Sequence, residues 1–198
     1  MAKVVDYYFS PMSPWTYLGH ARFNALLARY GAQVKVKPAD YGKIFAASGG
    51  VPVKQRPVQR QAYRMVELRR FRDHVGLPLN LEPKFFPVPT EAAALLIIAA
   101  DQQQGASAAM NLAGAILRAC WAEERNIGDA PTLAHIAGEQ GLNGAALAEA
   151  APQMRATYEG YTQEAIEGQV FGAPTYIFVG EPFWGQDRLD FLERALAR

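Results

Sequence analysis

The chain of 198 residues contains a single cysteine, Cys120, and therefore lacks a CxxC motif. One cysteine cannot form a disulfide within the chain, and a lone thiol outside such a motif cannot cycle between a dithiol and a disulfide. This argues against a disulfide oxidoreductase. Cys120 lies in the apolar face of an alanine-rich expected helix, where we predict an inert core thiol. The expected location of the protein is the reducing cytoplasm.

The sequence also lacks an excess of one charge and a long hydrophobic run. Lys and Arg number 20 and Asp and Glu 19, whereas binding to nucleic acids or membrane surfaces generally needs a basic excess. The longest apolar run, residues 92–100, is too short to cross a bilayer, and the N-terminus does not resemble a signal peptide. His20, His74 and His135 show no ligand spacing with Asp, Glu or Cys, so we predict no metal site.

Strand patterns occur at the two ends of the chain. Residues 4–9 (VVDYYF) and 33–38 favour strands, with a helix from Pro14 to about Tyr30 between them. Residues 174–179 and 182–184 favour two more strands, and a closing helix is expected to start at Asp187. This order, βαβ followed later by ββα, predicts an α/β protein with a thioredoxin-like fold.

The middle of the chain is mostly helical in pattern. Expected helices cover residues 55–74, 90–104, 106–125, 132–139 and 152–169. We therefore expect a thioredoxin-like domain in residues 1–40 and 170–198, split by an inserted α-helical domain in residues 41–169.

Ser13 is the first candidate for a functional residue. Ser13-Pro14 is a helix-start signature, with Ser as the N-cap and Pro at the first helical position. An anionic sulfur placed there would gain a hydroxyl hydrogen bond and the positive end of the helix dipole, which lower the pKa of a thiol. The alternative, that Ser13 only caps the helix, is favoured by the local sequence taken by itself.

Two further candidates lie near the C-terminus. Pro174 begins a strand, where a trans proline is the usual case. Asp187 precedes a helix, where backbone N–H groups can bind a carboxylate and the Asp side chain can pair with an ammonium group. A plain N-cap role is equally favoured for Asp187, and the two roles are compatible.

Three motifs together resemble a known family. The segments SPWTYL at 13–18, VFGAPT at 170–175 and WGQDRL at 184–189 are similar to those of the 2-hydroxychromene-2-carboxylate isomerases. These enzymes are relatives of the kappa-class glutathione transferases and of the DsbA-type oxidoreductases. In the oxidoreductases a cysteine stands at the place of Ser13. The resemblance extends over essentially the full length. It implies a DsbA/kappa-class architecture, glutathione as cofactor, a small aromatic oxo-acid as substrate, and a homodimer.

The resemblance also implies a glutathione site. Ser13 would be the catalytic residue that holds the glutathione sulfur as a thiolate. A cis Ala173–Pro174 bond would present backbone groups to the cysteinyl part, at a conformational cost of about 0.5–1 kcal/mol. The γ-glutamyl end would lie against four consecutive residues: Trp184, Gly185, Gln186 and Asp187.

Substrate contacts are implied in and near the tract of residues 49–57. Gln55-Arg56 stands where Asn-Arg is typical of the family, and Arg56 could hold a carboxylate through its bidentate fork. The alternative for Arg56 is a solvated arginine in a basic stretch. Lys43 is a second cationic candidate, although the family lysine falls about two residues later, at Phe45.

Two features that follow this tract in the sequence also bear on the substrate site. Phe85 or Phe86 would wall the aromatic pocket, with core packing as the default for both. The arginine-rich segment 56–72 is interrupted by Glu67 and has few aromatic residues, so a solvated or dimer-facing helix is favoured over a nucleic-acid surface.

The implied reaction interconverts 2-hydroxychromene-2-carboxylate and trans-o-hydroxybenzylidenepyruvate in aromatic hydrocarbon catabolism. Reversible addition of the glutathione thiolate would turn a conjugated double bond into a single bond that can rotate, and elimination would return the thiolate. Two alternatives stay open. One is a kappa-class-like glutathione transferase or peroxidase, which consumes the thiol, and the other is a non-catalytic glutathione-binding module.

Overall fold

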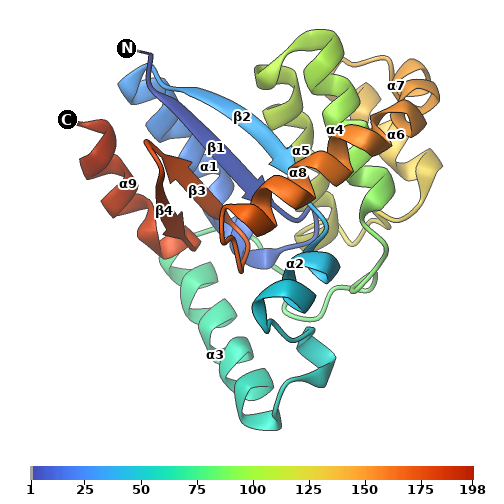
Figure 1. Ribbon diagram of the computed structural model, residues 1–198. Helices are drawn as coiled ribbons and strands as arrows, with labels where there is room; N and C mark the ends of the chain where they lie inside the picture. Colours follow the sequence, from blue (N-terminus) through green and yellow to red (C-terminus); the bar gives the residue numbers. More distant parts are fainter. Residues whose placement is uncertain (1) are drawn as a thin grey trace.

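Four strands form one mixed sheet in the order β2-β1-β3-β4 in the computed structural model, which describes residues 2–198. β1 (Val4–Phe9) runs parallel to β2 (Gln33–Pro38). β3 (Thr175–Phe178) is antiparallel both to β1 and to β4 (Glu181–Trp184). Strands from the two ends of the chain therefore meet in the centre of the sheet (Figure 1), which confirms the predicted thioredoxin-like fold.

The sheet is held by aromatic packing on its central strand. Tyr7 of β1 is fully buried, and its ring centroid lies 4.5 Å from that of Phe9 and 5.3 Å from that of Tyr176 in β3. Phe23 of α1 (Pro14–Tyr30) closes the cluster, 4.8 Å from the Tyr7 ring. The apolar and aromatic residues of β1 predicted this burial, because a strand in the middle of a covered sheet is apolar on both faces.

The helices between β2 and β3 are not a separate layer. The apolar residues of α4 and α5 belong to the same buried cluster as Tyr7 and Phe9, so the sheet shares its main core with these two helices. In Figure 1, α8 crosses in front of the strands, α4 to α7 gather on one side, and α3 extends toward the lower end. The remaining bounds are α2 (Tyr41–Ser48), α3 (Val58–Val75), α4 (Glu91–Gln104), α5 (Ala106–Trp121), α6 (Ala130–Glu139), α7 (Gly144–Ala150), α8 (Arg155–Glu167) and α9 (Leu189–Leu196).

Several predicted boundaries were wrong for local reasons. The helix expected from residue 55 starts only at Val58, because Gln55 ends a short 3-10 turn and Pro57 restricts the residue before it. The helix expected to reach residue 125 ends at Trp121, where the chain turns through Glu124 at φ 52°. The closing helix starts at Leu189, after a 3-10 turn over Gln186–Arg188 that contains Asp187.

Two features are absent from residues 2–198. No helix among them has the length and hydrophobicity needed to span a membrane. No group of three or more His, Cys, Asp or Glu side chains is arranged to hold a metal ion in this part of the chain.

Lys37 links β2 to its neighbours through charge. Its Nζ lies 2.6 Å from Glu164 Oε2 in α8, 3.0 Å from Asp6 Oδ1 in β1 and 3.2 Å from the Tyr8 hydroxyl. Burial of the ammonium group lowers its pKa, but the hydrogen bonds to Glu164, Tyr8 and Asp6 outweigh burial and raise the pKa above its ordinary value.

We expect Lys37→Met to lower the free energy of unfolding by about 1–3 kcal/mol, because two carboxylates lose their shared counter-ion. Urea unfolding followed by circular dichroism measures the change. Lys35→Met is the matched control, since Lys35 is 62% exposed and 3.8 Å from Asp6, and it should cost at most about 0.5 kcal/mol. Equal losses in the two variants would contradict the assignment of the network to Lys37.

Candidate functional site

Ser13 is the N-cap of α1, as predicted. Its Oγ accepts a hydrogen bond from the Thr16 N–H at 3.2 Å, and Pro14 occupies the first helical position. The same Oγ lies 3.5 Å from the carbonyl oxygen of Ala173, to which it donates a long hydrogen bond. Ser13 therefore stands at the positive end of a 17-residue helix and reaches a segment 160 residues away in the sequence.

The segment opposite Ser13 is the loop that leads into β3. The Ala173–Pro174 peptide bond is cis, which confirms the prediction made from the family resemblance. The carbonyl of Pro174 accepts from the Gly185 N–H at 2.9 Å. The carbonyl of Gly172 accepts from the Thr175 hydroxyl at 2.7 Å and from the Tyr41 hydroxyl at 3.2 Å. Hydrogen bonds from α2, β3 and the end of β4 thus fix the loop.

Trp184 ends β4 beside this loop. Its ring is half exposed and meets the Phe171 ring edge-on at a centroid distance of 4.7 Å. Gly172 lies against the indole so closely that a Cβ built on it would be 2.2 Å from Nε1 of Trp184. A side chain at position 172 would therefore fit only if the indole moved.

Gln186 and Asp187 follow and face different surroundings. Gln186 is 1% exposed, and Arg22 of α1 donates to its carbonyl at 3.3 Å and to its Oε1 at 3.2 Å. The Gln186 side chain therefore holds the 3-10 turn against α1 and does not face solvent. The Asp187 carboxylate is exposed and pairs with Arg188 at 2.7 Å. A ligand ammonium group at Asp187 would share the carboxylate with this arginine.

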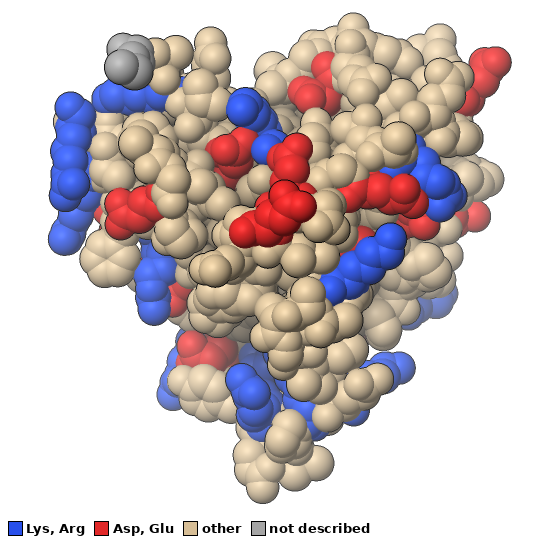
Figure 2. All heavy atoms as spheres, viewed as in Figure 1, with Lys and Arg blue, Asp and Glu red and all other residues tan. Residues whose placement is uncertain are grey.

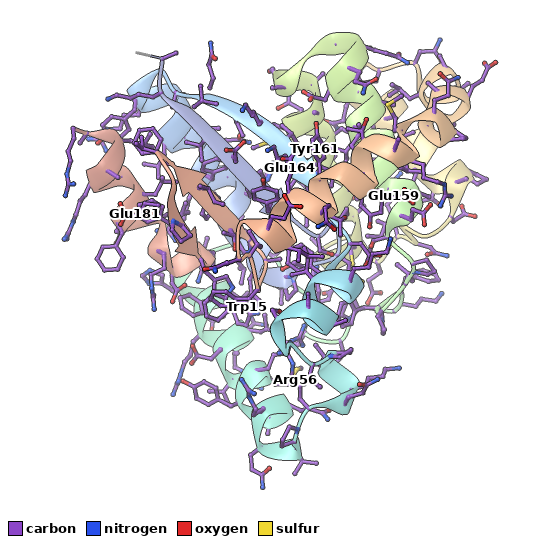
Figure 3. The ribbon with its side chains drawn as sticks, in the orientation of Figure 1. Trp15, Arg56, Glu159, Tyr161, Glu164 and Glu181 are labelled. Carbon is purple, nitrogen blue, oxygen red and sulfur yellow. The ribbon has the colours of Figure 1, made fainter. Side chains whose placement is uncertain are left out.

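The predicted substrate residues lie on α2 and on the connection from α2 to α3. Lys43 and Gln55 are exposed. Arg56 is half-buried, and its Nε donates to the Val51 carbonyl at 2.7 Å. Burial, aided by the charge of Arg60, lowers the pKa of Arg56. Figure 3 shows Arg56 at the lower end of the molecule, beside the start of α3, with Trp15 of the first turn of α1 nearer the sheet.

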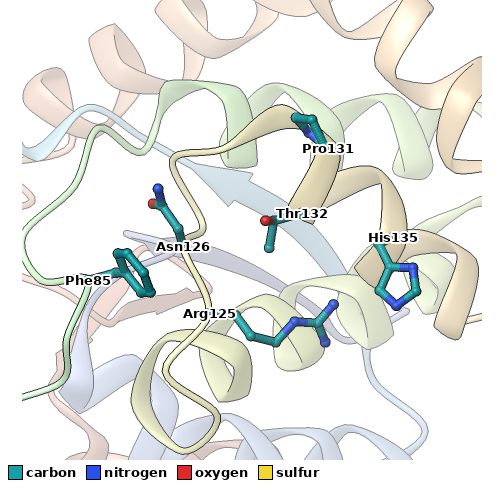
Figure 4. A pocket seen from close by; sticks show the side chains of 6 residues that line it. All are labelled: Phe85, Arg125, Asn126, Pro131, Thr132 and His135. Carbon is teal, nitrogen blue, oxygen red and sulfur yellow. The ribbon is translucent and has the colours of Figure 1, made fainter.

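The two phenylalanines considered for the aromatic pocket have different environments. Phe85 lines a hollow of about 490 Å³ (Figure 4). Phe86 instead packs on the indole of Trp121 with a centroid distance of 4.9 Å, and the Trp121 Nε1 donates to the Met12 carbonyl at 3.2 Å. Phe86 is therefore connected to the Ser13 segment, whereas substrate contact by Phe85 stays a prediction. The other residues around the hollow are Arg125, Asn126, Pro131, Thr132 and His135.

Cys120 has no redox role in this arrangement. Its side chain is buried in α5, and burial raises the pKa of the thiol to about 12. A thiol with that pKa stays protonated near neutral pH and is a poor nucleophile. The start of α1 thus presents a hydroxyl where thioredoxin-fold oxidoreductases need a reactive cysteine.

Fold and site together define a thioredoxin-fold protein without redox cysteines. The model of the DsbA-like thioredoxin domain matches residues 4–197, so the chain belongs to that family. Two curated relatives narrow the assignment to an enzyme. The 2-hydroxychromene-2-carboxylate isomerase of Pseudomonas putida is 31% identical, with 98% of this chain and 95% of the relative covered. That of Sphingobium xenophagum is 29% identical, with 99% of both covered. The chain is an isomerase of the 2-hydroxychromene-2-carboxylate isomerase family.

Solved structures agree with this placement. A 2-hydroxychromene-2-carboxylate isomerase structure superposes with a TM-score of 0.82 at 28% identity, covering 98% of this chain and 95% of the other. The cytosolic disulfide reductase DsbM of Pseudomonas aeruginosa, solved with GSH, superposes with a TM-score of 0.69 at 21% identity, covering 98% and 100%. The similarity to DsbM shows that the two proteins share a fold.

Proposed function

We propose that this isomerase uses glutathione as a cofactor to interconvert 2-hydroxychromene-2-carboxylate and trans-o-hydroxybenzylidenepyruvate. The observation that carries the proposal is the meeting of the Ser13 hydroxyl with the Ala173 carbonyl at the positive end of α1. A hydroxyl donor beside the partly exposed backbone at Ala173 suits a bound thiolate and its peptide, and the serine itself has no redox chemistry.

The residues around Ser13 fit a tripeptide with a charged γ-glutamyl end. Ser13 would donate to the sulfur, and the cis Ala173–Pro174 segment would pair with the cysteinyl backbone. Trp184, Gly185 and Asp187 would hold the γ-glutamyl group, with the exposed Asp187 carboxylate matching its ammonium. When bound, glutathione supplies the nucleophilic thiolate. The chain lowers the pKa of that thiol through the helix terminus and the hydroxyl, and it orients the substrate.

A cofactor assay tests the proposal. Enzyme freed of small molecules should not isomerise 2-hydroxychromene-2-carboxylate, and added glutathione should restore turnover. S-methylglutathione should bind but fail to restore it, because its sulfur cannot ionise. Free thiol, titrated before and after many turnovers, should stay constant, since a cofactor is not consumed. Full turnover without glutathione would contradict the proposal.

The two alternatives make different predictions in the same assay. A transferase would consume thiol with a chlorinated aromatic substrate and accumulate conjugate at a rate comparable to isomerisation. A non-catalytic module would bind glutathione in calorimetry and leave conjugated oxo-acids unchanged; the family assignment favours an enzyme over this module.

Gly172→Ala should weaken glutathione binding by about tenfold, equivalent to 1.4 kcal/mol. The new Cβ displaces the Trp184 indole from the place where we expect the γ-glutamyl group. The displaced ring is half exposed, so the free energy of unfolding should change by less than about 1 kcal/mol. Gly160→Ala is the control, because a Cβ there meets no atom within 4 Å. If calorimetry gave the same glutathione affinity for the wild type and Gly172→Ala, Trp184 would not be part of the glutathione site.

The resemblance further leads us to propose a homodimer, and the single cysteine leads us to propose a cytoplasmic location. Light scattering coupled to size-exclusion chromatography should give about twice the mass of one 21.7 kDa chain. A monomer at assay concentration would leave the Ser13 site unchanged, because every residue assigned to it comes from one chain.

A further inference from the structure

Arg64 of α3 is buried without a counter-ion. Its neighbours on the helix are solvated or paired: Arg70 contacts Glu67 at 2.8 Å, and Arg72 contacts Asp73 at 2.8 Å. Arg64 is 9% exposed and forms no salt bridge with any other residue of the described chain. Its Nη1 is 3.8 Å from the Met65 sulfur, and its Nη2 is buried with no hydrogen-bond partner.

Two aromatic rings lie beside this guanidinium. Its Cζ lies 5.5 Å from the ring centroid of Phe86 and 6.0 Å from that of Trp121. Ring faces attract a cation, but they do not accept the in-plane N–H groups that an arginine directs at an anion. The buried Nη2 donor therefore has no hydrogen-bond partner in the protein. Such a group costs folding free energy and is rare in native proteins, so it calls for an explanation.

A second positive charge increases this cost. Burial and the neighbouring charge of Arg56 lower the pKa of Arg64 to about 10, so the group is still charged at neutral pH. Figure 2 shows basic side chains at the lower end of this face, over α3 and the connection before it. The neighbouring charges of Arg56 and Arg64 create a positive potential that an incoming anion would neutralise.

The surroundings of Arg64 are connected to the start of α1 by direct contacts. Trp121 lies beside the Arg64 guanidinium and donates to the carbonyl of Met12, the residue before Ser13. Phe86 packs on the same indole. Trp15, in the first turn of α1, meets Phe71 of α3 edge-on at 5.9 Å. The Arg64 guanidinium and the backbone just before Ser13 therefore contact the same indole.

We infer that Arg64 binds the carboxylate of the aromatic oxo-acid substrate through its in-plane N–H groups, with Phe86 and Trp121 forming the apolar wall beside it. This inference rests on the proposed function for the identity of the substrate. Arg56 then contributes charge to the anion site while its own Nε stays bound to the Val51 carbonyl. The role is specificity for an acid over its neutral analogues, since a buried cation without its anion disfavours an uncharged ligand.

Calorimetry without glutathione tests the inference on two probes, benzylidenepyruvate and its methyl ester. In the wild type the acid should bind roughly 100-fold more tightly than the ester, as expected for a buried charge-assisted pair. In Arg64→Met, acid and ester should bind alike, because the group that distinguishes them is gone. Arg64→Lys should keep part of the preference, since it keeps the charge and loses the fork. Arg69→Met, an exposed arginine on the same helix, should bind both probes as the wild type does.

Urea unfolding of the same variants separates carboxylate binding by Arg64 from a purely structural role. Arg64→Met should unfold at the same or a higher urea concentration than the wild type, because it removes an unpaired buried charge and keeps an unbranched apolar chain in its place. An unchanged acid preference in Arg64→Met, or equal binding of acid and ester by the wild type, would overturn the inference. Should Arg64→Met fail to fold, the role would be structural and the Lys variant would then show full acid preference. Turnover that needs no glutathione would overturn the proposed function alone, since these binding measurements contain none.

Discussion

Ser13→Ala should reduce turnover by about 10²–10³-fold while the protein stays folded, as for removal of one preorganised hydrogen-bond donor to an anion in an active site. The hydroxyl is the side-chain donor at the positive end of α1, and its Oγ is 3.5 Å from the Ala173 carbonyl at the proposed cysteinyl subsite. Without it the bound thiol keeps only the helix terminus, so its pKa should rise and less thiolate should be present near neutral pH.

The same substitution removes a helix cap, and this second effect must be separated from the first. Loss of the Ser13 hydrogen bond to the Thr16 N–H should lower the free energy of unfolding by about 0.5–2 kcal/mol. Asn143→Ala is a matched control, because Asn143 caps α7 by accepting from the Ala146 N–H at 3.1 Å. The control should lose similar stability and keep wild-type turnover.

Thiolate absorbance of bound glutathione, followed against pH, gives the decisive measurement. The midpoint should move to higher pH in Ser13→Ala and stay in place in Asn143→Ala. Wild-type turnover in Ser13→Ala would mean that another group activates the sulfur. A fall in turnover with an unmoved midpoint would assign Ser13 to positioning of the peptide.

The sequence predicted the parts of the fold whose signals are local. Residues 4–9 and 33–38 are strands as expected, because β-branched and aromatic residues favour an extended, buried chain. The helix α2 was missed although it carries ordinary boundary signals: Asp40 caps it by accepting from the Gly42 N–H at 2.8 Å, and Gly49 ends it at φ 74°. Its eight residues are too few for a clear helical period.

The candidate site could be predicted only where family motifs indicated that residues far apart in the sequence lie together. Ser13 and Ala173 are 160 residues apart, and local sequence favoured a plain cap for one and a trans proline after the other. Arg64 could not be separated from the other arginines of α3, because a sequence gives the type of a residue and not its counter-ion. Only packing shows that Arg64 is buried against Phe86 and Trp121.

His20 gives the second large effect, a loss of stability in acid. The ring is buried between α1 and α5, with Nε2 2.9 Å from the Met110 carbonyl and Nδ1 3.2 Å from the Tyr7 hydroxyl. A carbonyl can only accept, so Nε2 carries the proton and Nδ1 accepts from Tyr7. Burial lowers the pKa of His20 from 6.5 to about 4, and the Met110 hydrogen bond offsets only part of the shift.

The sign of the pH dependence follows from which state binds the extra proton. Between pH 6.5 and about 4 the unfolded chain protonates His20 and the folded chain does not. Stability from this group is therefore complete above pH 6.5 and falls as the pH is lowered, by about 3 kcal/mol in total. Below the folded pKa both states are protonated and the loss stops.

Urea unfolding of the wild type and His20→Gln across this pH range isolates the effect from acid titration of the carboxylates. Gln can still donate to the Met110 carbonyl but does not titrate, so the variant should be less stable at neutral pH and should lose about 3 kcal/mol less on acidification. His74→Gln, at an exposed position, should follow the wild type. Parallel curves for wild type and His20→Gln would mean that folding does not lower the pKa of His20. Because the His20 contribution is constant above pH 6.5, thiolate titrations of the Ser13 variants in that range report on the site and not on the core.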